Sequence, residues 1–324
     1  MKVGIIGAGS IAGTMAGTIR EMDCAQNYAV AARDYGRAAE FAQTYGFEKA
    51  YGSYEELVED AGVELVYIAT PHSHHYEHIK LCLNHGKHVL CEKSFTVNES
   101  QAREVLALAR EKKLLLTEAI WTRYMPMRKT LDSVLSSGVI GRPYMLTANL
   151  GYIISGKERI MRPELAGGAL LDVGIYPLNF ASMVFGDEVD SITGTAVMTE
   201  TGVDAQNSIT ITYKDGKMAA LCSSAMGLSD RRGIIYGDNG FIEVENINNC
   251  EGIRVYDRSR NMIASYDTPK QISGYEYEVE ACLRAIKEGA LECPEMPHEE
   301  TLRMMGWMDE LRRQWGLVYP IMVS

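Results

Sequence analysis

A short glycine-rich segment near the start of the chain has the spacing of a dinucleotide-binding loop. It reads Gly7-Ala8-Gly9-Ser10-Ile11-Ala12 and matches the pattern G-x-G-x-x-A. In such a loop the first glycine permits a tight turn, the second lets a pyrophosphate approach the backbone, and the small last residue lets helix pack on strand. The helix that begins here offers N–H groups to the phosphates. The pattern predicts a nicotinamide dinucleotide site; the alternative is a glycine-rich turn without a ligand.

The end of the second expected strand decides between the two nicotinamide cofactors. A site that prefers NAD usually places an acidic residue there to bond the ribose 2′-hydroxyl. Here Ala32 fills the acidic position and Arg33 follows it. A guanidinium can bind a 2′-phosphate through two hydrogen bonds, and Arg37 could add a second contact. We therefore expect NADP, with NAD as a second option. The alternative is that both arginines are solvated surface charges and that Asp34 bonds the ribose.

The elements that must hold these loops alternate between buried strands and helices. Strands are expected at 2–6, 28–32, 65–69, 88–91 and 114–117, and helices at 11–22, 37–45, 76–84 and 98–112. Ser53-Tyr54-Glu55-Glu56 has the capping-box spacing that opens a further helix, because the serine and glutamate side chains can each satisfy a free backbone N–H. Strands that alternate with helices predict a parallel, doubly wound sheet.

The pattern changes near Thr122. Strand-like runs occur at 144–150 and across 190–266, with tight turns expected at 214–216 and 238–240, and two helices are expected near 275–288 and 298–314. We therefore expect two domains. Residues 1–122 would form a Rossmann α/β domain that binds the nucleotide. Residues 123–324 would form an α+β domain with a large open antiparallel sheet, for substrate binding and oligomerisation.

The composition bounds the classes of partner. The 324 residues are 46% hydrophobic and 23% charged, and the formal net charge of −11 argues against a nucleic-acid partner, which needs a basic face. We expect no signal peptide, because the first apolar stretch is too short, and no membrane span, because a run of about 18 apolar residues is lacking. The seven scattered cysteines include no C-x-x-C pair, which favours reduced thiols in a cytoplasmic protein.

Three further segments give the chain a specific resemblance. They are Ala69-Thr70-Pro71-His72-Ser73-His74-His75, Cys91-Glu92-Lys93-Ser94 and Gly167-Gly168-Ala169-Leu170-Leu171-Asp172-Val173-Gly174-Ile175-Tyr176. In this order and at this spacing, together with the glycine loop, they resemble the Gfo/Idh/MocA family (glucose–fructose oxidoreductase/inositol dehydrogenase). The segment Glu118-Ala119-Ile120-Trp121-Thr122-Arg123 and the tyrosine at 176 resemble the dimeric dihydrodiol dehydrogenase branch of that family.

The chain departs from the family pattern at two positions. Ser94 stands where the family usually has proline, in many members with a cis bond. Because a cis bond before a residue other than proline costs about 3 kcal/mol, we expect a trans bond between Lys93 and Ser94. Tyr176 stands where most of the family has histidine, but the dihydrodiol branch also has tyrosine there. The second departure therefore supports the branch rather than a loss of activity.

The resemblance implies that Lys93, Asp172 and Tyr176 carry the reaction. Oxidation of an alcohol needs a base for the proton, and Tyr176 is the candidate. Since the ordinary pKa of tyrosine is about 10, a cation such as Lys93 must favour the phenolate. Asp172 lies four residues before Tyr176 and shares a face with it if the segment is helical, so it could bond a substrate hydroxyl or orient Lys93. Taken alone, these residues could be a surface lysine, a helix cap and a packed core aromatic.

The resemblance also implies a wider set of binding residues. The cofactor-binding set comprises Gly7, Ala8, Gly9, Ser10, Ile11, Ala12, Arg33, Arg37, Ala69, Thr70, Pro71, His72, His75, Glu92 and Lys93. The substrate-pocket candidates are Trp121, Tyr152 and Arg162, although Trp121 could equally be a buried structural residue. A metal interpretation of the histidine cluster at 72, 74, 75 and 78 lacks converging ligands with a supporting shell, so we expect no metal.

These observations lead to one leading prediction and two others. The leading prediction is an NADP-dependent oxidoreductase that moves a hydride between the nicotinamide and the CH–OH carbon of a sugar, polyol or trans-dihydrodiol. The second is a ketosugar reductase that keeps its nucleotide bound between turnovers. The third is a non-catalytic dinucleotide-binding sensor or regulatory protein of the same fold. By resemblance we expect a homodimer or larger homo-oligomer, formed through the open face of the sheet.

Overall fold

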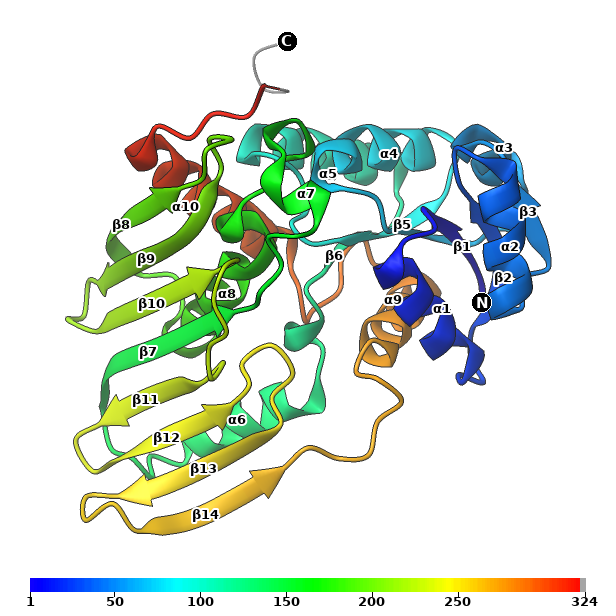
Figure 1. Cartoon of the computed structure of the whole chain (residues 1–324). Helices are drawn as coiled ribbons and strands as arrows, with labels where there is room; N and C mark the ends of the chain where they lie inside the picture. The colour runs from blue at the N-terminus through cyan, green and yellow to red at the C-terminus, as the bar shows by residue number, and fades with distance from the viewer. Residues whose placement is uncertain (321–324) are drawn as a thin grey trace. The chain divides into compact units, whose positions relative to one another are not determined.

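The computed structural model describes residues 1–320, which form two compact units. One unit contains Met1–Tyr124 and Gln271–Met305, and the other contains Met125–Lys270 and the chain from Gly306 onward. Figure 1 traces the chain through both. The change of sequence pattern predicted a boundary near Thr122, and the structure adds that Gln271–Met305 packs with the N-terminal sheet.

The first unit is built on a six-stranded parallel sheet in the order β3-β2-β1-β4-β5-β6. Its strands are β1 (Lys2–Ile6), β2 (Gln26–Ala31), β3 (Lys49–Tyr51), β4 (Leu65–Ile68), β5 (His88–Glu92) and β6 (Leu116–Ala119). The central strands β1, after its first residue Lys2, and β4 are buried and carry no charged residue, because both faces of a parallel sheet are covered. The predicted doubly wound sheet is confirmed. The short β3 had no counterpart in the sequence prediction, and β6 begins two residues later than expected.

Helices connect these parallel strands, and later segments complete the unit. The elements are α1 (Ser10–Arg20), α2 (Tyr35–Tyr45), α3 (Tyr54–Glu59), α4 (His72–Asn84), α5 (Glu99–Lys112), the 3₁₀ turn η1 (Trp121–Arg123) and α9 (Glu276–Glu288). The helix α10 (His298–Trp315) begins in this unit. The predicted helices of the N-terminal half are confirmed, with ends that differ by a few residues.

The capping box predicted at Ser53 is present in a modified form. The Ser53 hydroxyl accepts a hydrogen bond of 3.2 Å from the Glu56 N–H, as expected. The Glu56 carboxylate accepts one of 3.0 Å from the N–H of Gly52, one residue before the cap. Both bonds satisfy donors at the start of α3, so the serine and glutamate spacing predicted the helix start correctly.

The second unit is built on an eight-stranded sheet in the order β14-β13-β12-β11-β7-β10-β9-β8. Its strands are β7 (Pro143–Gly151), β8 (Val189–Met198), β9 (Asp204–Tyr213), β10 (Met218–Ser224), β11 (Gly233–Gly237), β12 (Gly240–Glu245), β13 (Gly252–Asp257) and β14 (Met262–Asp267). The predicted turns join β9 to β10 and β11 to β12. The sheet is mostly antiparallel, as predicted, but β7 and β10 pair in parallel, which the sequence pattern had not indicated.

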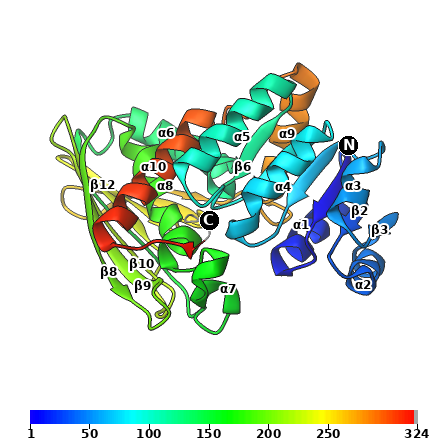
Figure 2. The same ribbon diagram turned by 90° about the horizontal axis from the view of Figure 1, so that it is seen from above.

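Helical segments cover one face of this sheet, as Figure 2 shows for α6 and α8. They are α6 (Pro126–Ser136), α7 (Glu158–Met161), η2 (Pro163–Leu165), the π-helical turn η3 (Leu170–Gly174) and α8 (Ile175–Phe185). The stretch Pro163–Phe185 is long and apolar enough to cross a membrane by composition alone, but most of it is buried inside the structure. Burial of this kind is typical of a core helix.

The opposite face of the eight-stranded sheet carries the exposed half of each alternating strand. Along β10, Ala219 and Leu221 are buried in the core, whereas Ala220 and Cys222 are exposed. This alternation places apolar side chains against the helices and leaves a second face that none of the described helices of this unit covers. We call this second surface the open sheet face.

Candidate active site

The glycine loop leaves the first helix ready to receive an anion. Gly7 has φ of +104°, and a Cβ there would lie 2.9 Å from the carbonyl oxygen of Ala69, so the turn requires glycine. Among residues 1–320, no side chain caps the N-terminus of α1 at Gly9, and a Cβ at Gly9 would meet no atom within 4 Å. An uncapped helix N-terminus with free space in front of it fits a pyrophosphate.

The loop after β2 carries the arginines predicted to read the cofactor. Arg33 and Arg37 are exposed, and the Arg37 guanidinium donates a hydrogen bond of 2.9 Å to the carbonyl of Ala8 in the glycine loop. The Asp34 carboxylate caps α2 by accepting a bond of 2.7 Å from the Arg37 N–H. One oxygen of Asp34 is therefore used for helix capping, and Arg37 joins the two loops that flank the expected nucleotide position.

The ends of β4 and β5 are joined by a buried histidine. His75 Nε2 lies 2.8 Å from the carbonyl oxygen of Thr70, and His75 Nδ1 lies 2.9 Å from that of Ser94. Burial lowers the pKa of His75 to about 4, so the ring is neutral near pH 7. A neutral ring carries one N–H and can therefore donate a hydrogen bond to only one of these two carbonyls at a time. Because the side chain is fully buried, His75 supports these loops through their backbone.

Other histidines of the same helix start pack against each other and the loop. The Thr70 hydroxyl and His78 Nδ1 are 2.9 Å apart, and the rings of His74 and His78 stack with centroids 5.8 Å apart. His74 and His78, four residues apart, therefore lie on one face of α4. His72 is buried and meets the His75 ring edge-on at 5.8 Å. Burial lowers the pKa of His78 to about 4, which keeps its ring neutral too.

Lys93 follows β5 and is anchored through the residue before it. The Glu92 carboxylate accepts a hydrogen bond of 3.2 Å from the Lys93 N–H and another from the buried hydroxyl of Tyr67 on β4. The expectation of a trans bond between Lys93 and Ser94 is wrong, because the bond is cis. Proline is not required here, since tertiary contacts of the buried Ser94 and its neighbour Phe95 hold the turn. The Phe95 N–H donates to Glu118 Oε1 at 3.2 Å.

Two buried acids beneath this turn were not identified from the sequence. Burial raises the pKa of Glu118 to about 7, and burial also raises the pKa of Glu278 well above its ordinary value. Both carboxyl groups are almost inaccessible to solvent. Glu118 lies within a segment that carried the resemblance, but its burial could not be recognised. Glu278 lies in an amphipathic helix where a glutamate normally indicates the solvent side.

Trp121, predicted as a wall of the substrate pocket, lies directly after β6. It is buried and stacks on Tyr275 with ring centroids 4.3 Å apart and planes inclined by 16°. Tyr275 comes from the distant start of α9 and was not predicted, because no spacing links it to Trp121. The stacked pair joins the start of α9 to the segment that follows β6.

Asp172 and Tyr176 belong to the second unit. Asp172 lies in the π-helical turn and Tyr176 in the first turn of α8, and both side chains are almost fully buried. The segment is helical, which is the condition set for a shared face, but its first turn is a π turn rather than an α turn. Arg159, which was not predicted, donates a hydrogen bond of 2.7 Å to Asp172 Oδ1. Nothing in the spacing of Arg159 marked it.

The two remaining pocket candidates are also in this unit. The Tyr152 hydroxyl accepts a hydrogen bond of 3.0 Å from the Asn248 amide. Arg162 is half exposed and forms ion pairs with Glu158 at 2.6 Å and Glu164 at 3.4 Å. Their place in a substrate pocket stays a prediction. Within residues 1–320, no three histidine, cysteine, aspartate or glutamate side chains converge as metal ligands would.

The parallel sheet and the glycine loop together define a Rossmann-type nucleotide-binding oxidoreductase. Residues 1–120 match the family profile described as "Oxidoreductase family, NAD-binding Rossmann fold", and residues 129–243 match "GFO/IDH/MocA C-terminal domain". The chain belongs to the Gfo/Idh/MocA family. The resemblance predicted from the sequence is thus confirmed, as is an enzyme of the dehydrogenase or reductase class.

Known relatives match the chain over nearly its whole length. A trans-1,2-dihydrobenzene-1,2-diol dehydrogenase from Xenopus tropicalis is 34% identical, covering 98% of this chain and 99% of the relative. The Homo sapiens protein of that name is 35% identical over 99% and 98%. Among solved structures, a 3-ketoreductase from Actinomadura kijaniata with NADP and TDP-benzene has a TM-score of 0.87 at 24% identity, covering 97% and 98%. An aldose–aldose oxidoreductase from Caulobacter crescentus has a TM-score of 0.88 at 18% identity, covering 97% of this chain and 97% of that structure.

The geometry of the glycine loop predicts a selective loss of nucleotide binding. In Gly9→Ala the new methyl group enters the free space before α1, so NADP affinity should fall by more than about tenfold because the pyrophosphate can no longer approach the backbone. The melting temperature should not change. Gly17→Ala, also on α1 and also without near neighbours, is the control and should keep full affinity. Equal affinity of both variants in a fluorescence titration would show that the loop does not bind the pyrophosphate.

Proposed function

We propose that this chain is an NADP-dependent dehydrogenase that moves a hydride between the nicotinamide and a CH–OH carbon of a trans-dihydrodiol, sugar or polyol. The observation that carries the proposal is the gathering of the glycine loop, Thr70 and Lys93 at the carboxyl edge of one parallel sheet. Relatives named for dihydrodiol oxidation, at about a third identity over the full length, support this substrate class.

The proposed chemistry assigns one role to each polar group. When bound, the nucleotide supplies or accepts the hydride. Tyr176 exchanges the hydroxyl proton of the substrate, Lys93 favours its phenolate, and Asp172 bonds a neighbouring hydroxyl. The bond from Arg159 holds the Asp172 carboxylate in one orientation. Residues 1–122 supply the nucleotide site, and residues 123–324 supply most of the substrate pocket, with Trp121, Tyr152 and Arg162 along it.

The preference for NADP rests on the loop after β2. The 2′-phosphate would lie beside Arg33, which is exposed and follows the buried Ala32 directly. Asp34 is engaged in capping α2, which supports an arginine rather than an acid as the group that reads the ribose. The exposed arginine also leaves room for NAD, at lower affinity.

Removal of the Arg33 guanidinium should separate the two nucleotides. Charge-assisted hydrogen bonds to a phosphate contribute about 1.5–3 kcal/mol. Arg33→Ala should therefore lower the affinity for NADP by roughly 10- to 100-fold and leave the affinity for NAD nearly unchanged. Titration of both nucleotides measures this difference. Arg103→Ala, an exposed arginine on α5, is the matched control. Equal losses for NADP and NAD would mean that Arg33 does not contact the 2′-phosphate.

The proton-transfer roles predict a loss of turnover without a loss of nucleotide. Lys93→Met and Tyr176→Phe should each lower kcat on the order of 100-fold, because an aligned acid/base contributes that much, while NADP affinity stays within about threefold. The measurement is NADPH formation with a panel of cyclic dihydrodiols, inositols and aldoses. An unchanged kcat in either variant would remove that residue from the mechanism. Tight NADP binding with no turnover in the wild-type protein would favour the non-catalytic alternative.

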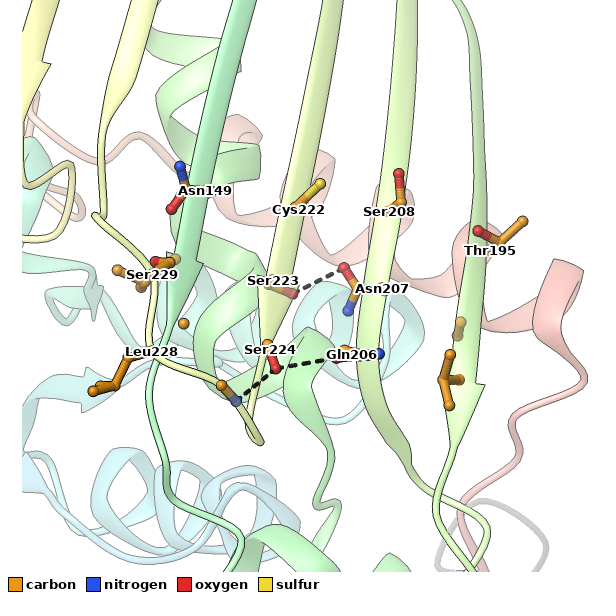
Figure 3. A pocket seen from close by; sticks show the side chains of 15 residues that line it. Asn149, Thr195, Gln206, Asn207, Ser208, Cys222, Ser223, Ser224, Leu228 and Ser229 are labelled. Carbon is orange, nitrogen blue, oxygen red and sulfur yellow. Dashed lines mark hydrogen bonds between the residues drawn. The ribbon is translucent and has the colours of Figure 1, made fainter.

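The open sheet face supports self-association in a homodimer. Large apolar side chains are exposed on it, among them Met145 on β7 and Met218 on β10, and a pocket of about 470 Å³ opens across β7, β10, β9 and β8 (Figure 3). Exposed apolar side chains on one sheet face are typical of an interaction surface, and a second copy of the chain would cover them. The seven cysteines are free thiols, which supports a reducing cytoplasm as the place of action.

A charge placed in the middle of the open sheet face should dissociate such a dimer. Ala220→Arg places a guanidinium at an exposed β10 position, where burial against a second copy would leave the charge unpaired. Light scattering after gel filtration should give the monomer mass. Gln43→Arg, an equal change on exposed α2, should leave the dimer intact. A monomeric wild-type protein, or a dimeric Ala220→Arg variant, would refute this interface.

A further inference from the structure

The glycines of the 167–176 segment are required because the segment lies directly on polar groups. A Cβ at Gly168, where φ is +106°, would lie 2.2 Å from Asp204 Oδ1, and a Cβ at Gly174 would lie 3.0 Å from the Ser223 hydroxyl. Asp204 begins β9, and Ser223 lies near the end of β10. At these two glycines the segment that carries Asp172 and Tyr176 therefore lies directly against polar side chains of β9 and β10.

A chain of hydrogen bonds joins these strands to the first residue of the π-helical turn. Asp204 Oδ2 accepts a bond of 2.8 Å from the Leu170 N–H and one of 2.9 Å from the Asn207 amide. The Ser223 hydroxyl donates a bond of 2.8 Å to Asn207 Oδ1, which Figure 3 shows as a dashed line between adjacent strands. Each bond depends on the next, because Asn207 is oriented by Ser223 and in turn orients the carboxyl group of Asp204.

Burial of the Asp204 carboxyl group costs free energy, because a charged group loses its hydration there. Asp204 is 1% exposed, and burial raises its pKa to about 6. Its second oxygen, Oδ1, has no hydrogen-bond partner within residues 1–320. The ionisable groups that face it are the Arg312 guanidinium from α10, which favours its ionised form, and the Tyr319 hydroxyl beyond that helix. At neutral pH the carboxyl group is thus ionised despite its burial.

The shape and hydrogen bonds of the site alone do not require a charge at Asp204. Asparagine would reproduce the shape: its oxygen could accept both bonds now made by Oδ2, and its amide would stand where Oδ1 lacks a partner. A neutral group would also avoid the cost of burying a charge. The carboxylate provides a charge that faces the Arg312 guanidinium, and it also provides a charge-assisted bond to the N–H that opens the helical segment 170–185, where a negative charge is favourable.

We propose that Asp204 is a positioning residue for hydride transfer: its carboxylate fixes the start of the π-helical turn and so fixes where Asp172 and Tyr176 lie. The inference rests on the proposed function, since it assigns the reaction to those two side chains. It extends that function by adding Asn207 and Ser223, which hold the carboxylate from the neighbouring strands.

The decisive variant is Asp204→Asn, with Asp190→Asn on exposed β8 as the matched control. We expect kcat at pH 8 to fall about tenfold with little change in KM, because a neutral acceptor forms the weaker bond. The wild-type kcat should fall as pH drops through about 6, where Asp204 takes up a proton, and Asp204→Asn should lack this step.

Stability should change in the opposite direction to activity. The folded-state pKa of Asp204 is raised, so its contribution to stability is present at low pH and is lost as pH rises through about 6. Asp204→Asn should therefore melt at an equal or higher temperature than the wild type at pH 8, and Asn207→Leu should lose both activity and stability. A purely structural role predicts a lower melting temperature of Asp204→Asn with unchanged kcat. Either that result or a wild-type pH profile in Asp204→Asn would overturn the proposal, whereas failure of the proposed function would show as no turnover in any protein.

Discussion

Parallel pairing of strands is the constraint on which the nucleotide site of this protein depends. Because β1, β4, β5 and β6 run in the same direction, their carboxyl ends lie at one edge of the sheet, and the segments that follow them begin there. The glycine loop, Thr70, Lys93 and Trp121 come from distant parts of the sequence and reach that edge by this rule alone. Their mutual support is then local: Gly7 approaches the carbonyl of Ala69 closely.

Backbone groups hold this edge together more than side-chain ion pairs do. The His75 ring contacts the carbonyls of Thr70 and Ser94. The Arg37 guanidinium donates a hydrogen bond to the carbonyl of Ala8. The Glu92 carboxylate accepts a hydrogen bond from the N–H of Lys93. Contacts to the backbone fix the course of a loop and do not depend on which side chains the loop exposes. The exposed positions are therefore left to bind a ligand. The second unit follows the same principle, since Asp204 acts on the N–H of Leu170.

Sequence reasoning predicted those features that depend on local spacing. The glycine loop, the capping serine at 53 and the alternation of strands and helices follow from contacts between near neighbours, and the structure contains all of them. The parallel pairing of β7 with β10 is different, because it joins strands about seventy residues apart that look alike in any register. The cis bond before Ser94 was missed for a related reason: proline is its usual local signal, and here tertiary contacts replace it.

Residues that act from beneath the site were the hardest to predict. Glu278, Asp204 and Arg159 are charged side chains, and the ordinary interpretation of such residues is an exposed surface. Only the structure shows that the first two are buried and that the third binds Asp172. By contrast, the sequence alone was enough to select Lys93, Asp172 and Tyr176, because the family pattern contains these positions. Their catalytic roles stay a proposal.

The central claim is that this chain transfers a hydride, and isotope transfer tests it most directly. A trans-dihydrodiol or polyol deuterated at its carbinol carbon is incubated with the protein and NADP, and the recovered nucleotide is analysed by NMR and mass spectrometry. The account predicts one deuterium in the nicotinamide ring of each reduced nucleotide, always on the same face. Bound NADP that acquires no deuterium from any alcohol of the panel would contradict it.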